Sequence, residues 1–432
     1  MNFLDELHWR GLLYQTTADR ELREHVSAPG RIGYCGFDPT SDSLTIGNFI
    51  PIKLLVHWQR CGHTPIVLMG GGTGLIGDPS GRDTERSLMT REEVEAHVAS
   101  QRRIMEKLLD FDPANPNAAV IVNNLDWLDR VGFIEMLRDV GKHFSVNEMI
   151  QRDSVKRRLE QREQGMSYTE FSYMILQAYD FLHLRRTRDC TCQIAGSDQY
   201  GNIVAGIDLI RREFGAENTQ AYGVTGPLVT RSDGGKMSKS SGGAIWMSAD
   251  TEDRTSPYAF YQYFINLPDA DVAQWLKWYT LLEQEEIEDI VARHERAPHE
   301  RVGQKTLAEE MTRLVHGEDE LRRVQSASRA LFTGDVRSLD EDLLDEVFAD
   351  VPSSAHERAH LEGDGVSLVE LLPETSLANS KREAREFLGN GAVAVNGEKV
   401  AAEHALTTKD LLHGRTILLR RGKKNWHATQ WR

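Results

Sequence analysis

Two lysines three residues apart carry the clearest chemical signal in the chain. They belong to Lys236-Met-Ser-Lys-Ser240, which Gly-rich sequence flanks on both sides. Two cationic side chains on such a loop can clamp a polyphosphate, and they help most where negative charge accumulates on a leaving group. Taken alone, such a pair is more often a solvated surface segment, so other residues must support the interpretation.

A second candidate site lies between a predicted strand and a predicted helix, in residues 34–48 (YCGFDPTSDSLTIGN). The strand should end at Gly36 and the helix should begin near Gly47. Ligands bind at the carboxyl ends of strands in an open α/β sheet, and the free N–H groups of a helix N-terminus suit a phosphate. We expect Pro51 near the first turn, where a missing N–H costs little. An ordinary strand-to-helix loop is the alternative.

A third candidate is a polar stripe on the helix predicted at 167–184. The capping box Ser167-Tyr-Thr-Glu170 should start this helix. Tyr173, Gln177 and Asp180 then fall on one face. Phenol, amide and carboxylate groups together suit a zwitterion with a phenolic tail. A solvated stripe is the alternative, because apolar residues lie on the same helix.

These groups need a scaffold, and the first half of the chain predicts a parallel sheet with helices on both faces. Short apolar runs, typical of buried strands, occur at 31–37, 65–70, 119–123 and 190–195. Helical patterns separate them, at 47–60, 91–110, 131–140, 145–163, 167–184 and 202–214.

The second half of the chain has a different pattern. Residues 257–348 show helical periodicity without strand signals, which predicts an all-helical domain. Residues 349–364 have the composition of a linker. The last segment combines a short helix at 380–389 with strand-like runs at 392–397 and 415–421, and Asn396-Gly397 predicts a tight turn.

Composition excludes several classes of protein. The chain has 432 residues, 40% of them hydrophobic, which is typical of a globular protein with about three domains. No apolar run is long enough to span a membrane, and the N-terminus lacks the features of a signal or transit peptide, so we expect a cytoplasmic location. The four scattered cysteines favour free or buried thiols over zinc ligands.

Charge is distributed unevenly along the chain. The net charge is −15, yet residues 365–432 contain 11 Lys and Arg against 7 Asp and Glu. A basic tail on an acidic body indicates a polyanionic partner for the tail. A tail kept soluble by its charge is the alternative.

One motif is misleading. Gly72-Thr-Gly-Leu-Ile-Gly77 matches the dinucleotide pattern G-x-G-x-x-G, but the following Asp78-Pro-Ser-Gly81 interrupts the helix that such a site requires. A nicotinamide-dependent enzyme is therefore disfavoured.

The passage T-I-G-N with K-M-S-K-S downstream resembles the signature pair of class I aminoacyl-tRNA synthetases. Longer strings, including GGGTGLIGDPSGR, EFSYMILQAYDF and QIAGSDQYGNI, resemble the bacterial tyrosyl-tRNA synthetase family, from about residue 2 to residue 431. The tail SKREAREFLGNGAVAVNGEKV resembles the S4 RNA-binding domain.

The resemblance implies a domain order. Residues 1–225 would form a Rossmann-like catalytic domain that contains a dimerisation insertion. Residues 226–348 would hold the KMSKS loop and an α-helical anticodon-side domain. A linker at 349–364 would then lead to an S4-like α+β domain at 365–432. The resemblance also implies a homodimer, with 124–150 as the expected interface.

The implied function is that of a tyrosine–tRNA ligase. Such an enzyme activates L-tyrosine with ATP and Mg²⁺, releases pyrophosphate, and transfers tyrosine to the 3′-terminal adenosine of tRNA(Tyr). No tightly bound cofactor, zinc or membrane is expected.

The resemblance also assigns residues to roles. For tyrosine, Tyr34 and Asp180 would bind the phenol OH, and the α-ammonium would be held by Asp78, Tyr173, Gln177 and Gln193. ATP would contact Cys35, Gly36, Asp38, Thr40, Gly47, Asn48, Asp198, Gln199, Lys236, Met237, Ser238, Lys239 and Ser240. The catalytic set would be Thr40, Thr45, Asn48, Arg82, Arg86, Lys236 and Lys239. tRNA would contact Lys381, Arg382, Arg385, Arg420, Arg421, Lys423 and Lys424.

Thr45 departs from the family pattern, which usually has His at this position. A hydroxyl can donate to a phosphate oxygen, but it is shorter than imidazole and never charged. This departure motivates a second hypothesis, an RNA-binding paralogue with an impaired ligase reaction. Four retained residues argue against it: Lys236, Lys239, Asp180 and Gln177.

Overall fold

The computed structural model describes residues 2–79, 88–152, 155–156, 159, 166–229, 244–248, 254–349, 351–422 and 425–432. It divides into two compact units. The first unit is Met1–Thr255 with Tyr263–Val315, and the second is Ser256–Gln262 with His316–Arg432. No helix in the described ranges is long and apolar enough to cross a membrane.

A six-stranded sheet forms the centre of the first unit, in the order β1-β6-β5-β2-β3-β4. Its strands are β1 (Gln15–Thr16), β2 (Ile32–Phe37), β3 (Thr64–Met69), β4 (Val120–Asn123), β5 (Cys192–Gly196) and β6 (Tyr222–Gly226). Every neighbouring pair is parallel except β1 with β6. The predicted parallel α/β fold is therefore confirmed. The sequence pattern does not reveal β1 and β6, because neither contains a continuous apolar run.

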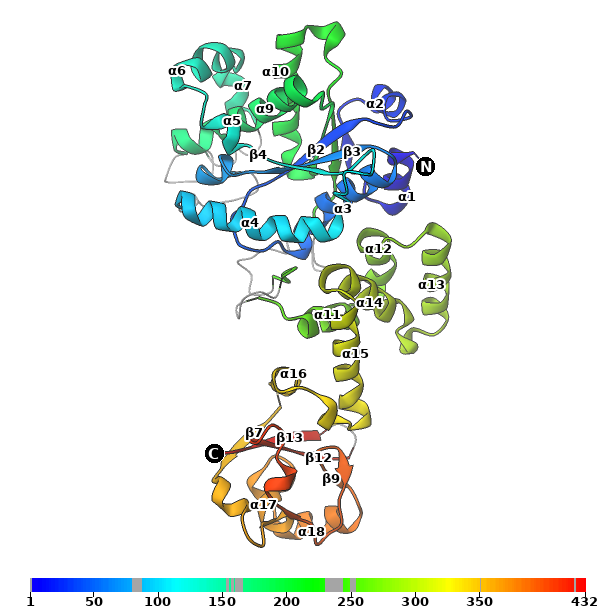
Figure 1. Ribbon diagram of the computed structural model, residues 1–432. Helices are drawn as coiled ribbons and strands as arrows, with labels where there is room; N and C mark the ends of the chain where they lie inside the picture. The colour runs from blue at the N-terminus through cyan, green and yellow to red at the C-terminus, as the bar shows by residue number, and fades with distance from the viewer. Residues whose placement is uncertain are drawn as a thin grey trace. The chain divides into compact units, whose positions relative to one another are not determined.

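Helices cover both faces of this sheet, with α3 and α4 on one side and α9 and α10 on the other (Figure 1). The helices of this part are α1 (Phe3–Arg10), α2 (Asp19–His25), α3 (Ile46–Arg60), α4 (Arg91–Leu108), α5 (Leu125–Leu128), α6 (Phe133–Glu135), α7 (Val146–Ile150), α9 (Tyr168–Arg188) and α10 (Tyr200–Phe214). Short helical turns join them: η1 (Thr73–Leu75), η2 (Met136–Val140), η3 (Gly141–His143), η4 (Ser197–Gln199) and η5 (Ala216–Asn218). Side chains from α9, α10 and the sheet, including Tyr34, Phe181 and Ile203, form one buried core.

Helix α3 begins at Ile46, one residue before the predicted start. Thr45 caps it, because its N–H and its hydroxyl both donate to Asn48 Oδ1, at 3.0 and 2.9 Å. Pro51 is consequently the sixth helical residue and lies beyond the four N–H groups that are free at a helix start. The prediction that its missing N–H costs little is wrong, since α3 loses the bond to the carbonyl of Gly47.

The chain from 254 to 348 contains helices and no strand among its described residues, as the sequence predicts. Its helices are α11 (Pro257–Ile265), α12 (Asp269–Tyr279), α13 (Gln284–Arg296), α14 (Val302–His316), α15 (Glu318–Thr333) and α16 (Glu341–Val347), with η7 (Pro298–Glu300) and η8 (Val336–Ser338) between them. Acidic first turns favour α12, α13, α15 and α16. Apolar inner faces, such as Val272 and Leu276 of α12, are typical of amphipathic helices.

A five-stranded sheet in the order β10-β9-β12-β13-β7 dominates the end of the second unit. Its strands are β7 (Ser353–His356), β9 (Val393–Val395), β10 (Glu398–Lys399), β12 (Thr416–Arg421) and β13 (Asn425–Trp431), and a separate pair comprises β8 (Val366–Ser367) and β11 (Ala405–Leu406). The helical pieces are α17 (Leu368–Leu371), α18 (Lys381–Gly389), η9 (Arg358–Leu361), η10 (Leu372–Glu374) and η11 (Thr408–Asp410).

Two sequence features of this sheet can be compared with the structure. Asn396 and Gly397 have φ values of 46° and 85° and join β9 to β10, so the predicted tight turn is confirmed. The range 349–364, which the composition favours as a linker, contains β7, and β7 pairs in parallel with β13. β7 is short and polar, so it carries no strand signal of its own.

Candidate active site

A cavity of about 380 Å³ opens at the carboxyl ends of β2 and β5, beside the N-terminus of α3. All described residues that the sequence assigns to tyrosine, ATP or catalysis line it: Tyr34, Cys35, Gly36, Asp38, Thr40, Thr45, Gly47, Asn48, Asp78, Tyr173, Gln177, Asp180, Gln193, Asp198 and Gln199. The parallel register explains the convergence, because Tyr34 on β2 is paired directly with Gln193 on β5. Their individual roles stay predictions.

Tyr34 and Asp180 are two fully buried polar groups on the cavity wall. Among the described residues, Tyr34 Oη has no hydrogen-bond partner, and burial raises the pKa of this phenol well above its usual value. The Tyr34 hydroxyl is therefore a protonated donor that a ligand can satisfy.

Asp180 is held by two donors from the chain after β4. Asn124 Nδ2 donates to Asp180 Oδ2 at 2.9 Å, and Trp127 Nε1 donates to Oδ1 at 2.7 Å. Burial raises the pKa of Asp180 to about 7, although these two hydrogen bonds oppose the rise. A carboxylate with two bonds keeps lone pairs for one more donor.

A second polar cluster joins Asp38, the residue after β2, to η1 and α9. Tyr173 Oη donates to Asp38 Oδ2 at 2.8 Å, and Thr73 Oγ1 donates to Asp38 Oδ1 at 2.7 Å. Burial raises the pKa of the Tyr173 phenol well above its usual value, and the negative charge of Asp38 adds to this effect. Asp38 thus fixes the Tyr173 ring against the cavity.

A chain of hydrogen-bonded side chains connects α9, α10, η4 and the carboxylate of Asp78. Asn202 Nδ2 donates to Gln177 Oε1 at 2.9 Å and to Gln199 Oε1 at 3.0 Å, and Gln199 Nε2 donates to Asp78 Oδ2 at 2.8 Å. These bonds orient carbonyl and carboxylate oxygens along one side of the cavity. Such oxygens accept hydrogen bonds and therefore suit an ammonium group.

The N-terminus of α3 forms another part of the wall. Thr45, Gly47 and Asn48 line the cavity there. The positive end of a helix dipole and its free N–H groups favour an anion at this position. The hydroxyl of Thr45, which the sequence suggests as a phosphate donor, donates to Asn48 Oδ1 instead.

Four polar residues around the cavity escape the sequence analysis: Thr73, Asn124, Trp127 and Asn202. Asn124 follows directly after the apolar run 119–123, and Trp127 comes three residues later. Polar residues at the end of a predicted parallel strand are the signal that could have identified them.

Part of the predicted machinery lies outside the described residues. This applies to Arg82 and Arg86 and to the whole segment Lys236-Met-Ser-Lys-Ser240, as well as to Lys423 and Lys424.

The described cations of the second unit fall into two groups. On α18, Lys381, Arg382 and Arg385 are exposed, and Lys381 pairs with Glu370. Arg420 stacks over the Trp426 ring, and Arg421 over the Phe387 ring. Ring contacts constrain the two arginines of β12, Arg420 and Arg421. The exposed cations of α18 are therefore better placed to bind a polyanion.

Among the described residues, no group of three or more His, Cys, Asp or Glu side chains is arranged to hold a metal ion. The four cysteines are free thiols.

Two family models match the chain. One, described as tRNA synthetases class I (W and Y), matches residues 31–333, and the other, described as Tyrosine--tRNA ligase SYY-like C-terminal domain, matches residues 344–429. The chain is 49% identical to a tyrosine–tRNA ligase of Bacillus caldotenax and 48% identical to one of Geobacillus stearothermophilus, over 100% of both chains in each case.

A solved structure agrees with these matches. A C-terminally truncated mitochondrial tyrosyl-tRNA synthetase of Aspergillus nidulans has a TM-score of 0.68 and 31% identity, and the match covers 77% of this chain and 94% of that one. The fold, the cavity at the strand ends and the family models define a class I tRNA synthetase. Within that class, the chain belongs to the tyrosine–tRNA ligase family, because its full-length relatives and its C-terminal domain are both of this kind.

Proposed function

We propose that this protein activates L-tyrosine with ATP, forming tyrosyl-adenylate and pyrophosphate, and then transfers tyrosine to the 3′-terminal adenosine of tRNA(Tyr). The full-length match to tyrosine–tRNA ligases carries the proposal. ATP enters with Mg²⁺ as part of the substrate. The proposed place of action is the cytoplasm, where bacterial tRNA is charged.

Tyrosine enters this scheme with its phenol between Tyr34 and Asp180. The phenol OH would donate to the carboxylate of Asp180 and accept from Tyr34 Oη, which lacks a partner among the described residues. Phenylalanine would leave these buried groups unpaired, a principle of selection for which tyrosyl-tRNA synthetases are the usual example. The α-ammonium would lie near Asp78, Tyr173, Gln177 and Gln193, which supply oxygen acceptors.

The chemistry needs no covalent intermediate with the protein. The tyrosine carboxylate attacks the α-phosphorus of ATP, and the bond to the β-phosphate oxygen breaks as pyrophosphate leaves. A ribose hydroxyl of tRNA then attacks the tyrosyl carbonyl and AMP leaves. The protein's part is to position the reactants and stabilise negative charge. We assign this to the N-terminus of α3 with Thr40, Thr45 and Asn48, and to Arg82, Arg86, Lys236 and Lys239.

The experiment that tests this function is tyrosine-dependent exchange of pyrophosphate into ATP, followed by charging of tRNA(Tyr). We expect exchange with tyrosine and none with phenylalanine. The alternative, an impaired RNA-binding paralogue, would bind tRNA without exchange. The comparisons give this alternative no support.

We further propose that the protein is a homodimer through residues 124–150. Within this range Phe133, Ile134, Leu137 and Val146 are exposed, with 67% and 72% of Phe133 and Ile134 accessible. Exposed apolar groups of this kind mark protein interfaces. Sedimentation analysis should give a dimer for the parental protein and a monomer for Ile134→Glu. A monomeric parental protein would contradict the proposal.

A further inference from the structure

The C-terminal end of α12 contacts the first turn of α3. Tyr279, the last residue of α12, donates from Oη to the carbonyl of Ile46 at 3.1 Å. Its ring stacks on Phe49 at a centroid distance of 5.5 Å and an interplanar angle of 10°. Tyr279 is completely buried. Ile46 lies between Thr45 and Gly47, which both line the cavity.

The next residue, Thr280, contacts α3 further along its axis. Lys53 is fully buried and donates from Nζ to the Thr280 carbonyl. Ile46 and Lys53 are seven residues apart, which corresponds to about 10 Å along a helix. Two consecutive residues of one segment therefore hold α3 at two separated levels, and this fixes the axial position of the helix.

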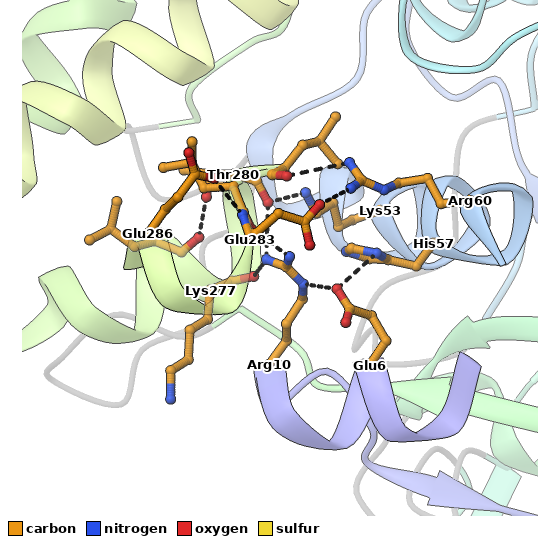
Figure 2. A network of polar contacts seen from close by, with 12 residues as sticks. Glu6, Arg10, Lys53, His57, Arg60, Lys277, Thr280, Glu283 and Glu286 are labelled. Atoms are coloured by element: carbon orange, nitrogen blue, oxygen red, sulfur yellow. Dashed lines mark hydrogen bonds and ion pairs between the residues drawn. The ribbon is translucent and has the colours of Figure 1, made fainter. Parts of the chain in front are cut away.

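Residues 277–282, which include the two residues that contact α3, are held by hydrogen bonds from cationic side chains (Figure 2). Arg10 of α1 donates to the carbonyls of Lys277 at 3.1 Å, Thr280 at 3.3 Å and Leu282 at 2.7 Å, and Glu6 accepts from its Nε at 2.6 Å. Arg60 at the end of α3 donates to the carbonyl of Leu281 at 3.3 Å. Cationic side chains stabilise the carbonyl groups at the C-terminus of a helix. These hydrogen bonds therefore fix the link between α12 and α13 against α1 and α3.

The first turn of α3 needs such support. Pro51 supplies no N–H for the carbonyl of Gly47, so the first turn lacks one main-chain bond to the rest of the helix. The bond from Tyr279 to Ile46 attaches this same turn from outside.

We propose that Tyr279 is a positioning residue for adenylate formation, which holds the first turn of α3, and with it Thr45 to Asn48, where the ATP phosphates must lie. Lys53 supports the same placement through Thr280. This inference rests on the proposed function. The competing view is that the Tyr279 hydroxyl only satisfies a buried carbonyl and affects stability alone.

The test is Tyr279→Phe, which removes the hydroxyl and keeps the stacked ring. We expect the rate constant of tyrosine-dependent pyrophosphate exchange to fall about three- to tenfold, the equivalent of one lost hydrogen bond, or the KM for ATP to rise by that factor. The KM for tyrosine should not change, because Tyr34 and Asp180 lie on β2 and α9.

The matched control is Thr280→Val. It also removes one buried hydroxyl, but that hydroxyl donates to Leu276 within α12, and the carbonyl that Lys53 binds remains. This variant should keep the parental exchange kinetics. Lys53→Met is the second variant, and it should affect the ATP-dependent parameters in the same direction as Tyr279→Phe.

Two results would overturn the inference: parental kinetics in Tyr279→Phe, or equal changes in Tyr279→Phe and Thr280→Val that follow their thermal midpoints. If Tyr279→Phe does not fold, parental ATP kinetics in Lys53→Met would overturn it. Failure of the parental protein to exchange would instead overturn the proposed function, so the two failures are distinguishable.

Discussion

In the cavity of the first unit, buried polar side chains bond to one another, whereas the cations on α18 of the second unit lie exposed. Asp180 is fully buried and has two neutral donors, Asn124 and Trp127. Arg382 and Arg385 are exposed to solvent. A buried hydrogen bond depends on direction and on each partner, while an exposed charge acts at a distance and is screened by salt. The cavity is therefore suited to distinguish ligands by one hydroxyl, and α18 to attract a polyanion.

Among the variants that test this comparison, Asp180→Ala should cause the largest loss of activity. The variant removes the charged acceptor that we assign to the tyrosine phenol, which should cost about 1.5–3 kcal/mol of transition-state stabilisation. The kcat/KM for tyrosine should therefore fall by a factor of roughly 10 to 160. Pyrophosphate exchange measures this loss, which should be the same at low and high salt. Asp208→Asn, at a half-exposed acid of α10, is the control. Parental tyrosine kinetics in Asp180→Ala would remove this residue from the pocket.

The two regions also differ in how far the sequence predicts them. The face formed by Tyr173, Gln177 and Asp180 follows from helical spacing, and the strand ends that carry Tyr34 and Gln193 follow from apolar runs. Periodicity is local, so it locates these groups well.

Contacts between distant segments escape this kind of prediction. Asn124 and Trp127 reach Asp180 more than fifty positions away in the chain. In the second unit, β7 is a strand only because β13 pairs with it. Such contacts depend on tertiary packing, which overrides local propensity.

A smaller and pH-dependent effect is expected for Trp127→Phe. Burial holds the pKa of Asp180 at about 7, and the ionised carboxylate accepts the hydrogen bond of the phenol OH more strongly than the protonated carboxyl does. The kcat/KM for tyrosine should therefore rise as the pH increases through about 7. Trp127→Phe removes a donor that stabilises the ionised form, so the inflection should move to higher pH. At pH 6 to 7 this would lower kcat/KM about three- to tenfold.

The pH profile of tyrosine-dependent exchange checks this prediction. The Trp127 ring stacks on His183 at 4.3 Å, and phenylalanine can keep that contact. An inflection at the same pH in both proteins would show that the Trp127 hydrogen bond does not control the ionisation of Asp180.

On α18 we expect a still smaller effect that depends on salt. The double variant Arg382→Ala with Arg385→Ala should weaken tRNA binding about threefold at low salt, because each exposed charge contributes less than about 1 kcal/mol. The slope of log affinity against log salt should decrease by roughly one for each lost phosphate contact. Tyrosine activation serves as the internal control and should not change. A loss of binding that is equal at all salt concentrations would contradict the polyanion interpretation of α18.

The smallest effect concerns stability at low pH, where histidines of the two units can be compared. In the first unit, burial lowers the pKa of His25 to about 4, and the positive charge of Arg31 adds to this. In the second unit, burial lowers the pKa of His356 and of His427. In both units the folded form keeps these rings neutral, while the unfolded chain takes up the proton near pH 6.5. The unfolded chain then binds more protons, so stability is complete above about pH 6.5 and is lost as the pH falls toward the folded pKa.

The variant His25→Gln should change the pH dependence of stability in the first unit and leave that of the second unit as it is. Glutamine cannot titrate in this range, and it can still form a hydrogen bond like that of His25 Nε2 with Thr191 Oγ1. When the pH is lowered from 7.5 to 5, β2 and β6 should lose protection against hydrogen exchange in both proteins. This loss should be smaller in His25→Gln than in the parental protein. We expect a difference of less than about 1 kcal/mol, since His25 is half-exposed and solvent screens its charge. Exchange in β12 and β13 should be the same in both proteins, because the titrating groups there are unchanged. An unaltered pH dependence in β2 and β6 would mean that His25 already takes up its proton in the folded state.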